Sequence, residues 1–562
     1  MRSRRSPFEN PVALLAVAPL LALVVFSPAL GGGFVHDDHR QIVGNPLVQN
    51  LSQLPLLFST GVWAGAGSGS SWYRPLMMSS FALDRAFLGP AALGFHAVSL
   101  LIFAIVAVLA VRCMSVFGAS APAALLAGAL GAVHPAQAEA VAWISARCDL
   151  LLAVFGIAAL LLYERALRPP QSGKLMHPGW SLGDLRGAAG VAYLAALLSK
   201  ESAVALAPVF ACVDRVRSAP VTLRALIARH APWLLALGVY LLLRAHSLGG
   251  VSGGILAPLD PLAVLAALGQ GAARLFAPFA LTISPPAPAQ WHAVFGVLVG
   301  IAASAGAVSA WRRRSQLLIP IALAVLPLGI AALGAARVGE MADRYLVLPI
   351  FATAWLVAAG IEALPAPGRF VGRVAGAAAV GAFAVAAATH VRVYASDEAL
   401  WTDAWQKNPR SVRAAANLGA LHLDRDEPYR AAEWLDRAAA LAPDDAEIEM
   451  NRALVAERQG DARGARSRLD ALVAAQPWYW PANLRAGHLA LAAKDWNAAG
   501  EHYEAALRVH PLAAEAWAGL AFARAEQGRD ADARRAAERA LALDPRVQNA
   551  DALRRLLERL RS

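Results

Sequence analysis

Two adjacent carboxylates, Asp37 and Asp38, stand in the segment FVHDDH, just after the first long apolar run of the chain. A carboxylate held at a membrane surface can act as a general base that takes a proton from a hydroxyl group. The pair can also be read as the start of a solvated loop. The flanking histidines suggest a metal site, but four such groups within four residues cannot all face one ion. We therefore predict Asp37 and Asp38 as catalytic residues and assign no metal ligands; a divalent cation is an alternative that is not favoured.

Other ionisable side chains gather near the ends of apolar segments, where inserting a charge costs about 2.5–3.5 kcal/mol. Such groups are candidates for substrate binding, although they can equally pair with one another and hold helices together. Carboxylates and cations on one side of a membrane suit a phosphate-bearing lipid, which Arg and Lys hold by charge-assisted hydrogen bonds. The candidate substrate-binding and lipid-phosphate-binding residues are His36, Arg74, His134, Glu139, Arg147, Asp149, Lys200, Glu201 and Arg344.

The composition indicates which elements must position these residues. Of the 562 residues, 57% are apolar and 16% are charged, against about 25% charged in ordinary soluble proteins. Residues 1–395 contain 27 Lys and Arg against 14 Asp and Glu, whereas residues 396–562 contain 24 against 26. A basic membrane part is therefore followed by a charge-balanced soluble part. The positive charges lie between apolar segments, so nucleic acid is excluded as a partner.

Most apolar runs approach the roughly 20 residues that a helix needs to cross a membrane. They lie at about 11–30, 94–111, 121–133, 150–163, 231–243, 293–310, 317–335, 345–361 and 374–389, with interrupted stretches at 187–213 and 261–283. The sequence predicts about 11 spans. The first run could instead be a cleaved signal peptide. This is the weaker interpretation, because so many spans follow it.

Lys and Arg placement gives the orientation, because cytoplasmic loops carry an excess of both. Basic clusters near residues 2–5, 165–186, 215–229, 312–314 and 369–373 then lie inside. This arrangement requires residues 187–213 to cross twice, and 261–283 to be re-entrant or interfacial. A rival arrangement crosses once at each stretch and puts 215–229 outside, so we rank it second. In both, the N-terminus is cytoplasmic and the C-terminal part lies on the outer side.

The soluble part has a 34-residue period, the period of tetratricopeptide repeats. Prolines recur at 409, 443, 477, 511 and 545, and each is expected to end a helix. A small residue recurs in the first helix of each unit, at Gly419, Ala453, Gly487 and Ala521, and another recurs near the start of the second helix, at Ala431, Ala465, Ala499 and Ala533. Four residues after the second position stands a residue that is mostly larger, at Leu435, Leu469, Tyr503 and Ala537. Small residues let the paired helices approach closely, and the larger residue fills the space between them. Four repeats can stack into a superhelix with a binding groove.

The predicted fold is therefore all-α, a polytopic membrane helix bundle followed by a tetratricopeptide-repeat solenoid. We expect a transmembrane domain at 1–395 with an outer loop at 31–90, and a linker or leading helix at 396–411. Four repeats at 412–545 and a capping helix at 546–562 follow.

Four segments carry a resemblance to a known family: FVHDDHRQIVGNPLV at 34–48, HPAQAEAVAWISARCD at 134–149, SKE at 199–201 and RYLVLP at 344–349. With the order of membrane part and repeats, they resemble the TMTC family, transmembrane, tetratricopeptide-repeat-containing O-mannosyltransferases, and its bacterial relatives. The resemblance covers nearly the whole chain. The sequence departs from the family pattern at His36, where an aromatic residue commonly precedes the aspartates, and at Ala146, where Gly is usual.

The resemblance implies a glycosyltransferase of the GT-C fold. It also implies a sugar donor linked to a polyprenyl phosphate, with mannose as the candidate sugar, and an inverting transfer on the outer side. The acidic motif of the family falls on Asp37 and Asp38, one of which would deprotonate the acceptor hydroxyl. The leaving phosphate carries its charge well, so one base suffices, unlike the carboxylate pair of glycosidases. We expect the repeat groove either to recruit a protein acceptor, through Ser or Thr, or to hold a partner enzyme while the acceptor is a lipid or glycan.

Only four of the 51 basic residues are Lys, a bias that is typical of GC-rich genomes and indicates a bacterial source. With the predicted spans and orientation, we expect a multi-pass protein of a bacterial inner membrane with its repeats in the periplasm. An alternative function is a catalytically inactive, membrane-anchored repeat scaffold of the cell envelope. A transporter is a third hypothesis, which internal inverted repeats would favour; the sequence shows none.

Overall fold

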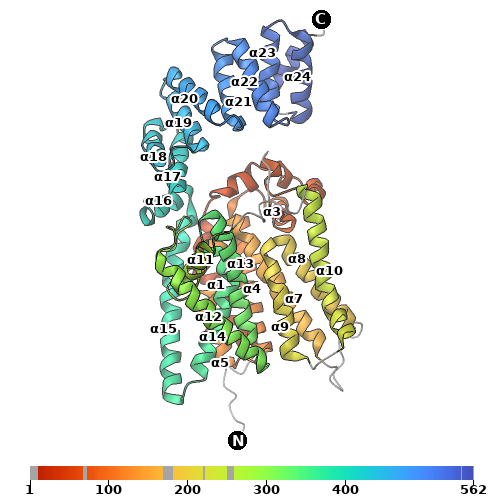
Figure 1. Cartoon of the computed structure of the whole chain (residues 1–562), viewed down its shortest axis with the longest axis vertical. Coiled ribbons are helices and arrows are strands. Elements are labelled where there is room, and N and C mark those ends of the chain that lie inside the picture. The colour runs from red at the N-terminus through yellow and green to blue at the C-terminus, as the bar shows by residue number, and fades with distance from the viewer. Residues whose placement is uncertain are drawn as a thin grey trace. The chain divides into compact units, whose positions relative to one another are not determined.

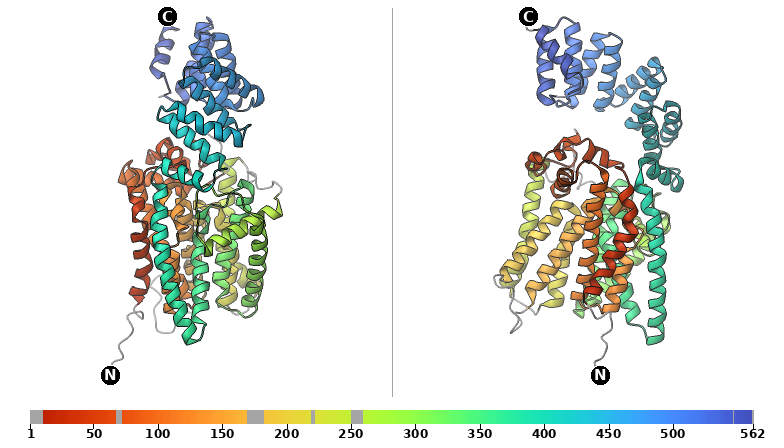
Figure 2. Two further views of the ribbon diagram at one scale, coloured as in Figure 1. Left: turned by 90° about the vertical axis from the view of Figure 1, so that its left-hand side faces the viewer. Right: turned by 180° about the vertical axis from the view of Figure 1, so that it is seen from behind.

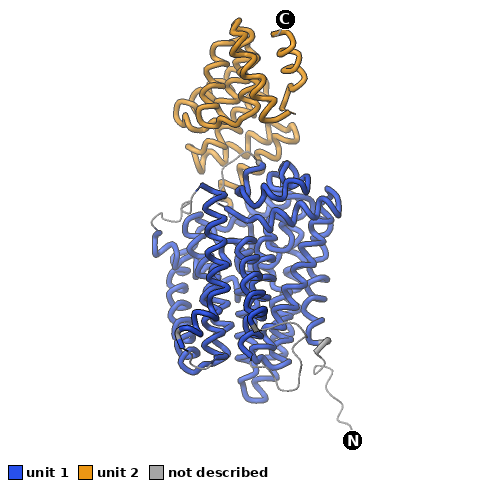
Figure 3. Tube along the Cα trace, turned by 90° about the vertical axis from the view of Figure 1, so that its right-hand side faces the viewer, with its two compact units in different colours: residues 1–408 blue, residues 409–562 orange. Residues whose placement is uncertain are grey.

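The computed structural model describes residues 11–66, 72–168, 182–218, 222–249, 259–545 and 547–560. Within these ranges the regular structure is helical and contains no strand (Figure 1). The chain divides into two compact units, residues 1–408 and residues 409–562 (Figure 3), and each is described by itself. The all-α fold predicted from the sequence is confirmed.

Eight helical segments of the first unit are long and apolar enough to cross a membrane, among the described residues. They contain α1 (Pro11–Phe26), α4 (Ala92–Val116), α7 (Arg147–Leu167), α10 (Leu223–Leu248), α12 (Gln290–Arg312), α13 (Leu318–Val338), α14 (Val347–Glu362) and α15 (Ala366–His390). The prediction of a multi-pass membrane protein is confirmed, but the predicted count of about 11 spans is not.

The other three predicted spans form helices that do not reach the length and hydropathy of the eight. They are α5 (Ala121–Ala132), α8 (Leu182–Ser199) and α9 (Ala207–Arg217). The 12 residues of α5 extend about 18 Å at 1.5 Å per residue, well short of a hydrocarbon core of about 30 Å. Helix α8 begins with the charged residues Asp184 and Arg186, which lower its hydropathy.

The chain reverses its direction at Lys200, between α8 and α9. The Lys200 ammonium lies 2.5 Å from a carboxylate oxygen of Asp149, in the first turn of α7. Further along, Arg217 at the end of α9 lies 3.0 Å from the carboxylate of Glu164, near the other end of α7. Residues 200–217 therefore run the length of α7, and α8 and α9 form a hairpin as the preferred arrangement requires.

A 3₁₀ segment, η8 (Glu201–Leu206), explains how the second arm of the hairpin, with few residues, extends along the whole length of α7. Its six residues rise about 2.0 Å each and cover about 12 Å. The 11 residues of α9 add about 16 Å. The arm therefore extends about 28 Å, close to the thickness of a hydrocarbon core.

Basic clusters distant in sequence meet at the end of the bundle where α7 and α9 terminate. Arg217 donates to the carbonyl of Val116, the last residue of α4, and Arg215 donates to the carbonyl of Trp311 in α12. Residues 32–66 and 72–74 gather at the other end, which we call the loop end (Figure 2). Segments predicted to lie on one side of a membrane thus share one end of the bundle.

Helix α11 (Pro261–Phe276) starts and finishes at the loop end. The preceding helix α10 ends there, because Ser247 donates to the carbonyl of Phe58. The following helix α12 finishes at the opposite end, so it starts at the loop end. Helix α11 therefore does not cross the bundle.

Helices α11 and α12 approach closely enough that only glycine fits between them. A Cβ on Gly269 would lie 1.8 Å from the carbonyl oxygen of His292, and one on Gly296 would lie 2.1 Å from that of Leu265. Backbone atoms cannot move aside as a flexible side chain can. These two glycines are therefore needed for the close approach.

The second unit contains four helix pairs whose first helices begin 34 residues apart. The pairs are α17 (Val412–Asp424) with α18 (Pro428–Leu441), α19 (Ala446–Arg458) with α20 (Ala462–Ala475), α21 (Trp480–Ala492) with α22 (Trp496–Val509), and α23 (Ala514–Glu526) with α24 (Asp530–Leu543). A last helix, α25 (Ala550–Arg559), buries Leu553 and Leu556. The predicted repeats are confirmed.

The predicted repeat positions are buried, and the prolines follow the helices that they were expected to end. The alanines at 431, 465, 499 and 533 are completely buried. Each second helix stops two residues before its proline. The Tyr503 ring occupies the larger position of its unit, where a Cβ added to Gly487 or Gly519 would approach it within 2.7 Å and 2.2 Å.

Replacing Gly296 by Ala should destabilise the first unit, because the added methyl group meets the backbone of α11. We expect a loss of about 1–3 kcal/mol, the usual cost of overpacking, measured by unfolding in detergent. The control is Gly300→Ala, one turn further on α12, where a Cβ meets no atom within 4 Å. There Ala should stabilise slightly through its higher helix propensity, and equal losses in both variants would contradict the close contact.

Candidate active site

The two aspartates of the acidic motif occupy different environments. The side chain of Asp38 is completely buried. One of its carboxylate oxygens accepts hydrogen bonds from the Ser145 N–H at 2.8 Å and the Ser145 hydroxyl at 2.5 Å, and the other accepts from the Val35 N–H at 3.1 Å. Asp38 therefore fastens the loop at 35–38 to the segment η7 (Ile144–Ala146).

Burial raises the pKa of Asp38 to about 7, because the lost hydration outweighs the three hydrogen bonds that favour its charged form. The charge of neighbouring Asp37 raises this pKa further. Both oxygens of Asp38 are engaged inside the protein, where they support the loop.

Asp37 remains partly accessible, with 26% of its side chain exposed. One carboxylate oxygen lies 3.5 Å from Nε2 of His36. The His36 ring lies between two indoles, with ring centres 5.4 Å from Trp143 and 5.0 Å from Trp401. Of the two aspartates, Asp37 is the one that a substrate can contact.

Two ion pairs join residues 72–74, α7 and the hairpin turn. Arg74 donates two hydrogen bonds to the carboxylate of Glu201, at 2.6 and 2.9 Å. Lys200 donates to both oxygens of Asp149, at 2.5 and 2.6 Å. The predicted candidates Arg74, Asp149, Lys200 and Glu201 thus lie together, with each cation already matched to a carboxylate.

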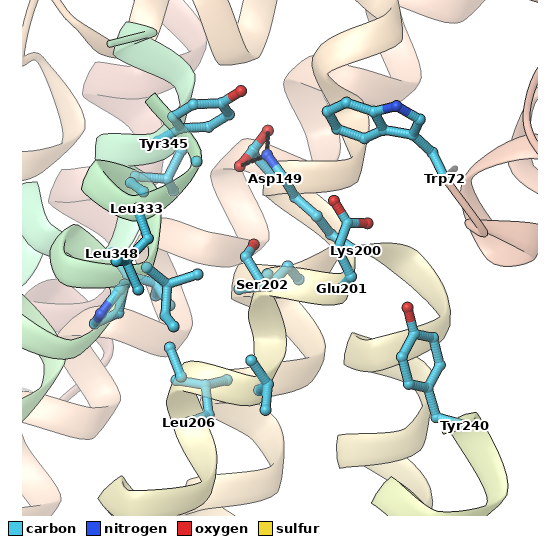
Figure 4. Close-up of a pocket in the computed structure, with 18 of the residues that line it drawn as sticks. Trp72, Asp149, Lys200, Glu201, Ser202, Leu206, Tyr240, Leu333, Tyr345 and Leu348 are labelled. Atoms are coloured by element: carbon cyan, nitrogen blue, oxygen red, sulfur yellow. Dashed lines mark hydrogen bonds and ion pairs between the residues drawn. The ribbon is translucent and has the colours of Figure 1, made fainter. Parts of the chain in front are cut away.

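A cavity of about 630 Å³ begins at this charged group and continues between apolar side chains (Figure 4). Its polar lining includes Trp72, Asp149, Lys200, Glu201, Ser202, Tyr240, Arg244, Arg337 and Tyr345. Its apolar lining includes Leu206, Leu237, Leu241, Ile330, Leu333 and Leu348. The volume and composition are those of a ligand site, and the three lining cations exceed the two lining carboxylates by one charge.

Tyr345 connects this cavity with the surroundings of the acidic motif. The Lys200 ammonium lies 4.3 Å from the centre of its ring. The Arg344 guanidinium lies 4.8 Å from the centres of both the Tyr345 ring and the Trp143 ring. Aromatic and cationic groups therefore form a continuous contact from His36, the neighbour of Asp37, to the cavity.

Several sequence candidates lie outside the described lining of the cavity. Arg147 is completely buried and forms an ion pair with Asp84 at 2.5 Å. Glu139 is buried and pairs with Arg344. His134 is buried, and one ring nitrogen lies 3.3 Å from the carbonyl oxygen of Leu275. Asp37, Asp38 and His36 also lie outside the described lining.

Two lining arginines were not assigned to the site from the sequence. They are Arg244 and Arg337. Arg244 is 6% exposed and lies near the end of α10 at the loop end. The rule used to orient the chain assigns Lys and Arg to the cytoplasmic side, whereas the predicted orientation puts Arg244 on the outer side. That exception to the rule is the signal that could have identified Arg244 as a site residue.

Among the described residues, no group of three or more His, Cys, Asp and Glu side chains is arranged to hold a metal ion.

The chain is similar to animal proteins named protein O-mannosyl-transferases. The chain is 38% identical over 202 residues to protein O-mannosyl-transferase Tmtc2 of Drosophila melanogaster, covering 35% of this chain and 21% of that protein. It is 35% identical over 165 residues to TMTC4 of Homo sapiens, covering 26% and 22%. The chain spans about a fifth of the length of these relatives. The predicted resemblance is confirmed, and no protein-family model matches the chain.

Solved structures resemble only part of the chain. YrrB, described as a tetratricopeptide-repeat protein with an unusual peptide-binding site, is 14% identical, with a TM-score of 0.24, covering 28% of this chain and 81% of YrrB. PilW, a type IV pilus biogenesis factor, is 18% identical, with a TM-score of 0.26, covering 29% and 81%. We infer nothing about function from these likenesses.

The raised pKa of Asp38 should make stability depend on pH. Between about pH 4 and about pH 7 the folded protein holds a proton on Asp38 that the unfolded chain has lost, so stability should fall as pH rises through this range. Thermal unfolding of the purified protein at several pH values measures the fall. In Asp38→Asn, which carries no titratable group there, this part of the pH dependence should be absent; an unchanged profile would contradict the assignment.

Proposed function

We propose that the chain is a membrane glycosyltransferase that moves a sugar from a polyprenyl-phosphate carrier to a hydroxyl acceptor at the loop end of the bundle. The observation that carries the proposal is the cavity, whose apolar walls end at a cluster of cations and carboxylates. Tyr345, Arg344 and Trp143 link this cluster to His36 in the acidic motif. The relatives named protein O-mannosyl-transferases support sugar transfer, with mannose as the first candidate and protein Ser or Thr as the acceptor.

The cavity suits a lipid whose head group is anionic. Its leucine and isoleucine side chains match an isoprenoid chain, which is apolar along its whole length. Lys200, Arg244 and Arg337 at the polar part can hold a phosphate by charge-assisted hydrogen bonds. The remainder of the carrier would extend from the cavity into the membrane.

Asp37 is the proposed base. It would take the proton of the acceptor hydroxyl while the acceptor oxygen forms a bond to the anomeric carbon. The bond from that carbon to the phosphate oxygen breaks in the same step, and the polyprenyl phosphate leaves with the electron pair. Attack opposite the leaving group inverts the configuration at the anomeric carbon. Asp38 would keep the loop in place through Ser145.

The proposed location is a bacterial inner membrane, with the loop end and the repeats on the periplasmic side and the N-terminus in the cytoplasm. The gathering of Arg215, Arg217 and Arg314 with the ends of α4 and α12 supports this orientation, because cytoplasmic loops carry the excess of positive charge. The repeats would recruit the acceptor, or a partner enzyme of the cell envelope.

Replacing Asp37 by Asn should lower the rate of transfer about 100- to 10,000-fold, the usual contribution of a general base. The assay supplies purified protein with a panel of polyprenyl-phosphate sugars and Ser- and Thr-containing peptides, and follows donor loss and product. Glu362→Gln is the control, because Glu362 pairs with Arg373 at the opposite end of the bundle and should leave transfer unchanged.

Two further outcomes separate the alternatives. If Asp37→Asn transfers normally while Asp149→Asn does not, the base is a cavity carboxylate and our assignment is wrong. If no variant and no donor gives transfer, yet deletion of the repeats abolishes a cell-envelope phenotype, the chain is a scaffold.

Filling the cavity should abolish donor use without touching the acidic motif. Leu333→Trp places a large ring among the lining residues, and we expect donor binding, measured by crosslinking to a photoreactive polyprenyl phosphate, to fall at least tenfold. Leu235→Trp on α10 is the matched control, because Leu235 is 69% exposed and lies outside the described lining. Equal crosslinking in both variants would show that the carrier binds elsewhere.

A further inference from the structure

The acidic motif contains a backbone conformation that a non-glycine residue seldom adopts. His36 has a φ angle of +52°, in the left-handed region, which is costly for a residue with a Cβ. Such a conformation persists only when surrounding contacts hold it. The bend at His36 sets the direction in which the next side chain, that of Asp37, leaves the backbone.

Besides the local hydrogen bonds and the Trp143 ring, contacts at this bend come from α16 (Asp397–Lys407), more than 350 residues further along the chain. The His36 N–H donates to one carboxylate oxygen of Asp397 at 2.8 Å. The other oxygen lies 2.7 Å from Nε2 of His39. The two oxygens of Asp397 thus hold the residues on either side of the aspartate pair.

Helix α16 is a firm support for this contact within the first unit. Leu400, Trp401 and Ala404 are buried. At the far end of the helix, Lys407 donates to the carbonyl of Leu281 at 2.8 Å, and Asn408 donates to that of Ser284 at 3.2 Å. The start of the helix is capped by Ser396, whose hydroxyl accepts from the Ala399 N–H. Asp397 is therefore not needed as the cap of its own helix.

We propose that Asp397 is a positioning residue that holds the left-handed bend at His36 and so keeps Asp37 directed at the acceptor. This inference rests on the proposed function of Asp37. Asp397 lies outside the described lining of the cavity, so its removal should disturb the direction of Asp37 and leave the donor site intact. Misplacement of a catalytic group by about 1 Å can cost about 100-fold in rate.

Replacing Asp397 by Ala should lower kcat about 10- to 100-fold and leave the donor KM and the photoreactive-lipid crosslinking unchanged. The matched control is Asp403→Ala on the same helix, where Asp403 pairs with Lys407 and should leave kcat unchanged. Wild-type kcat in Asp397→Ala, or an equal loss in Asp403→Ala, would overturn the proposal.

A pair of double variants tests the backbone conformation itself. Both double variants carry Asp397→Ala, and one adds His36→Gly while the other adds His36→Ala. Both lack the imidazole ring, but only glycine adopts a positive φ without cost. We expect the glycine variant to have a kcat several-fold above that of the alanine variant. Equal values would show that Asp397 does not act through the bend.

Hydrogen–deuterium exchange of the full-length protein separates a failure of this inference from a failure of the proposed function. The His36 amide is bonded to Asp397, so exchange in residues 33–44 should rise in Asp397→Ala and stay at the wild-type level in Asp403→Ala. If no donor is turned over, the proposed function fails, but a rise in exchange in Asp397→Ala alone would still support the contact between Asp397 and His36. Unchanged exchange in Asp397→Ala would overturn the inference whatever the activity.

Discussion

A charge buried at the end of a helix bundle must find a partner, and this constraint organises the loop end of the first unit. Removing a charge from water costs several kcal/mol, which only a close opposite charge with good hydrogen bonds offsets. Here the partners come from different segments of the chain: Arg147 with Asp84, Lys200 with Asp149, Arg74 with Glu201 and Arg344 with Glu139. Each pair fixes two segments against one another, so the geometry of the site follows from the pairing of charges.

The same pairs show what sequence reasoning can predict and what it cannot. The repeats were predictable because a proline every 34 residues acts locally, on the helix that it ends. The long apolar spans were predictable because hydropathy is also a local property. Which carboxylate meets which cation depends on contacts between residues as far apart as Glu139 and Arg344, and spacing along the chain does not contain that information.

The reach of the hairpin arm is another property that the sequence does not show. Counting Ala207 to Arg217 as an α-helix gives too short an arm, and only the structure reveals the steeper rise of the preceding 3₁₀ segment. The acidic motif was located from the sequence, but the difference between its members was not. Asp38 is enclosed by Val35 and by Ser145, whereas Asp37 stays accessible, and Ser145 lies more than 100 positions further along the chain.

Under the proposed function, the charges around the cavity have a consequence for turnover. The cations Arg74, Lys200, Arg244 and Arg337 exceed the carboxylates Asp149 and Glu201 by two, since Arg74 pairs with Glu201 at the edge of the lining. The proposed donor is a phosphodiester with a single negative charge, whereas the spent carrier would be a monoester with a charge of about −1.5 to −2. A surplus of two positive charges matches the spent carrier more closely than the loaded one. Departure of the spent carrier, and not arrival of the donor, would then be the step that these charges slow.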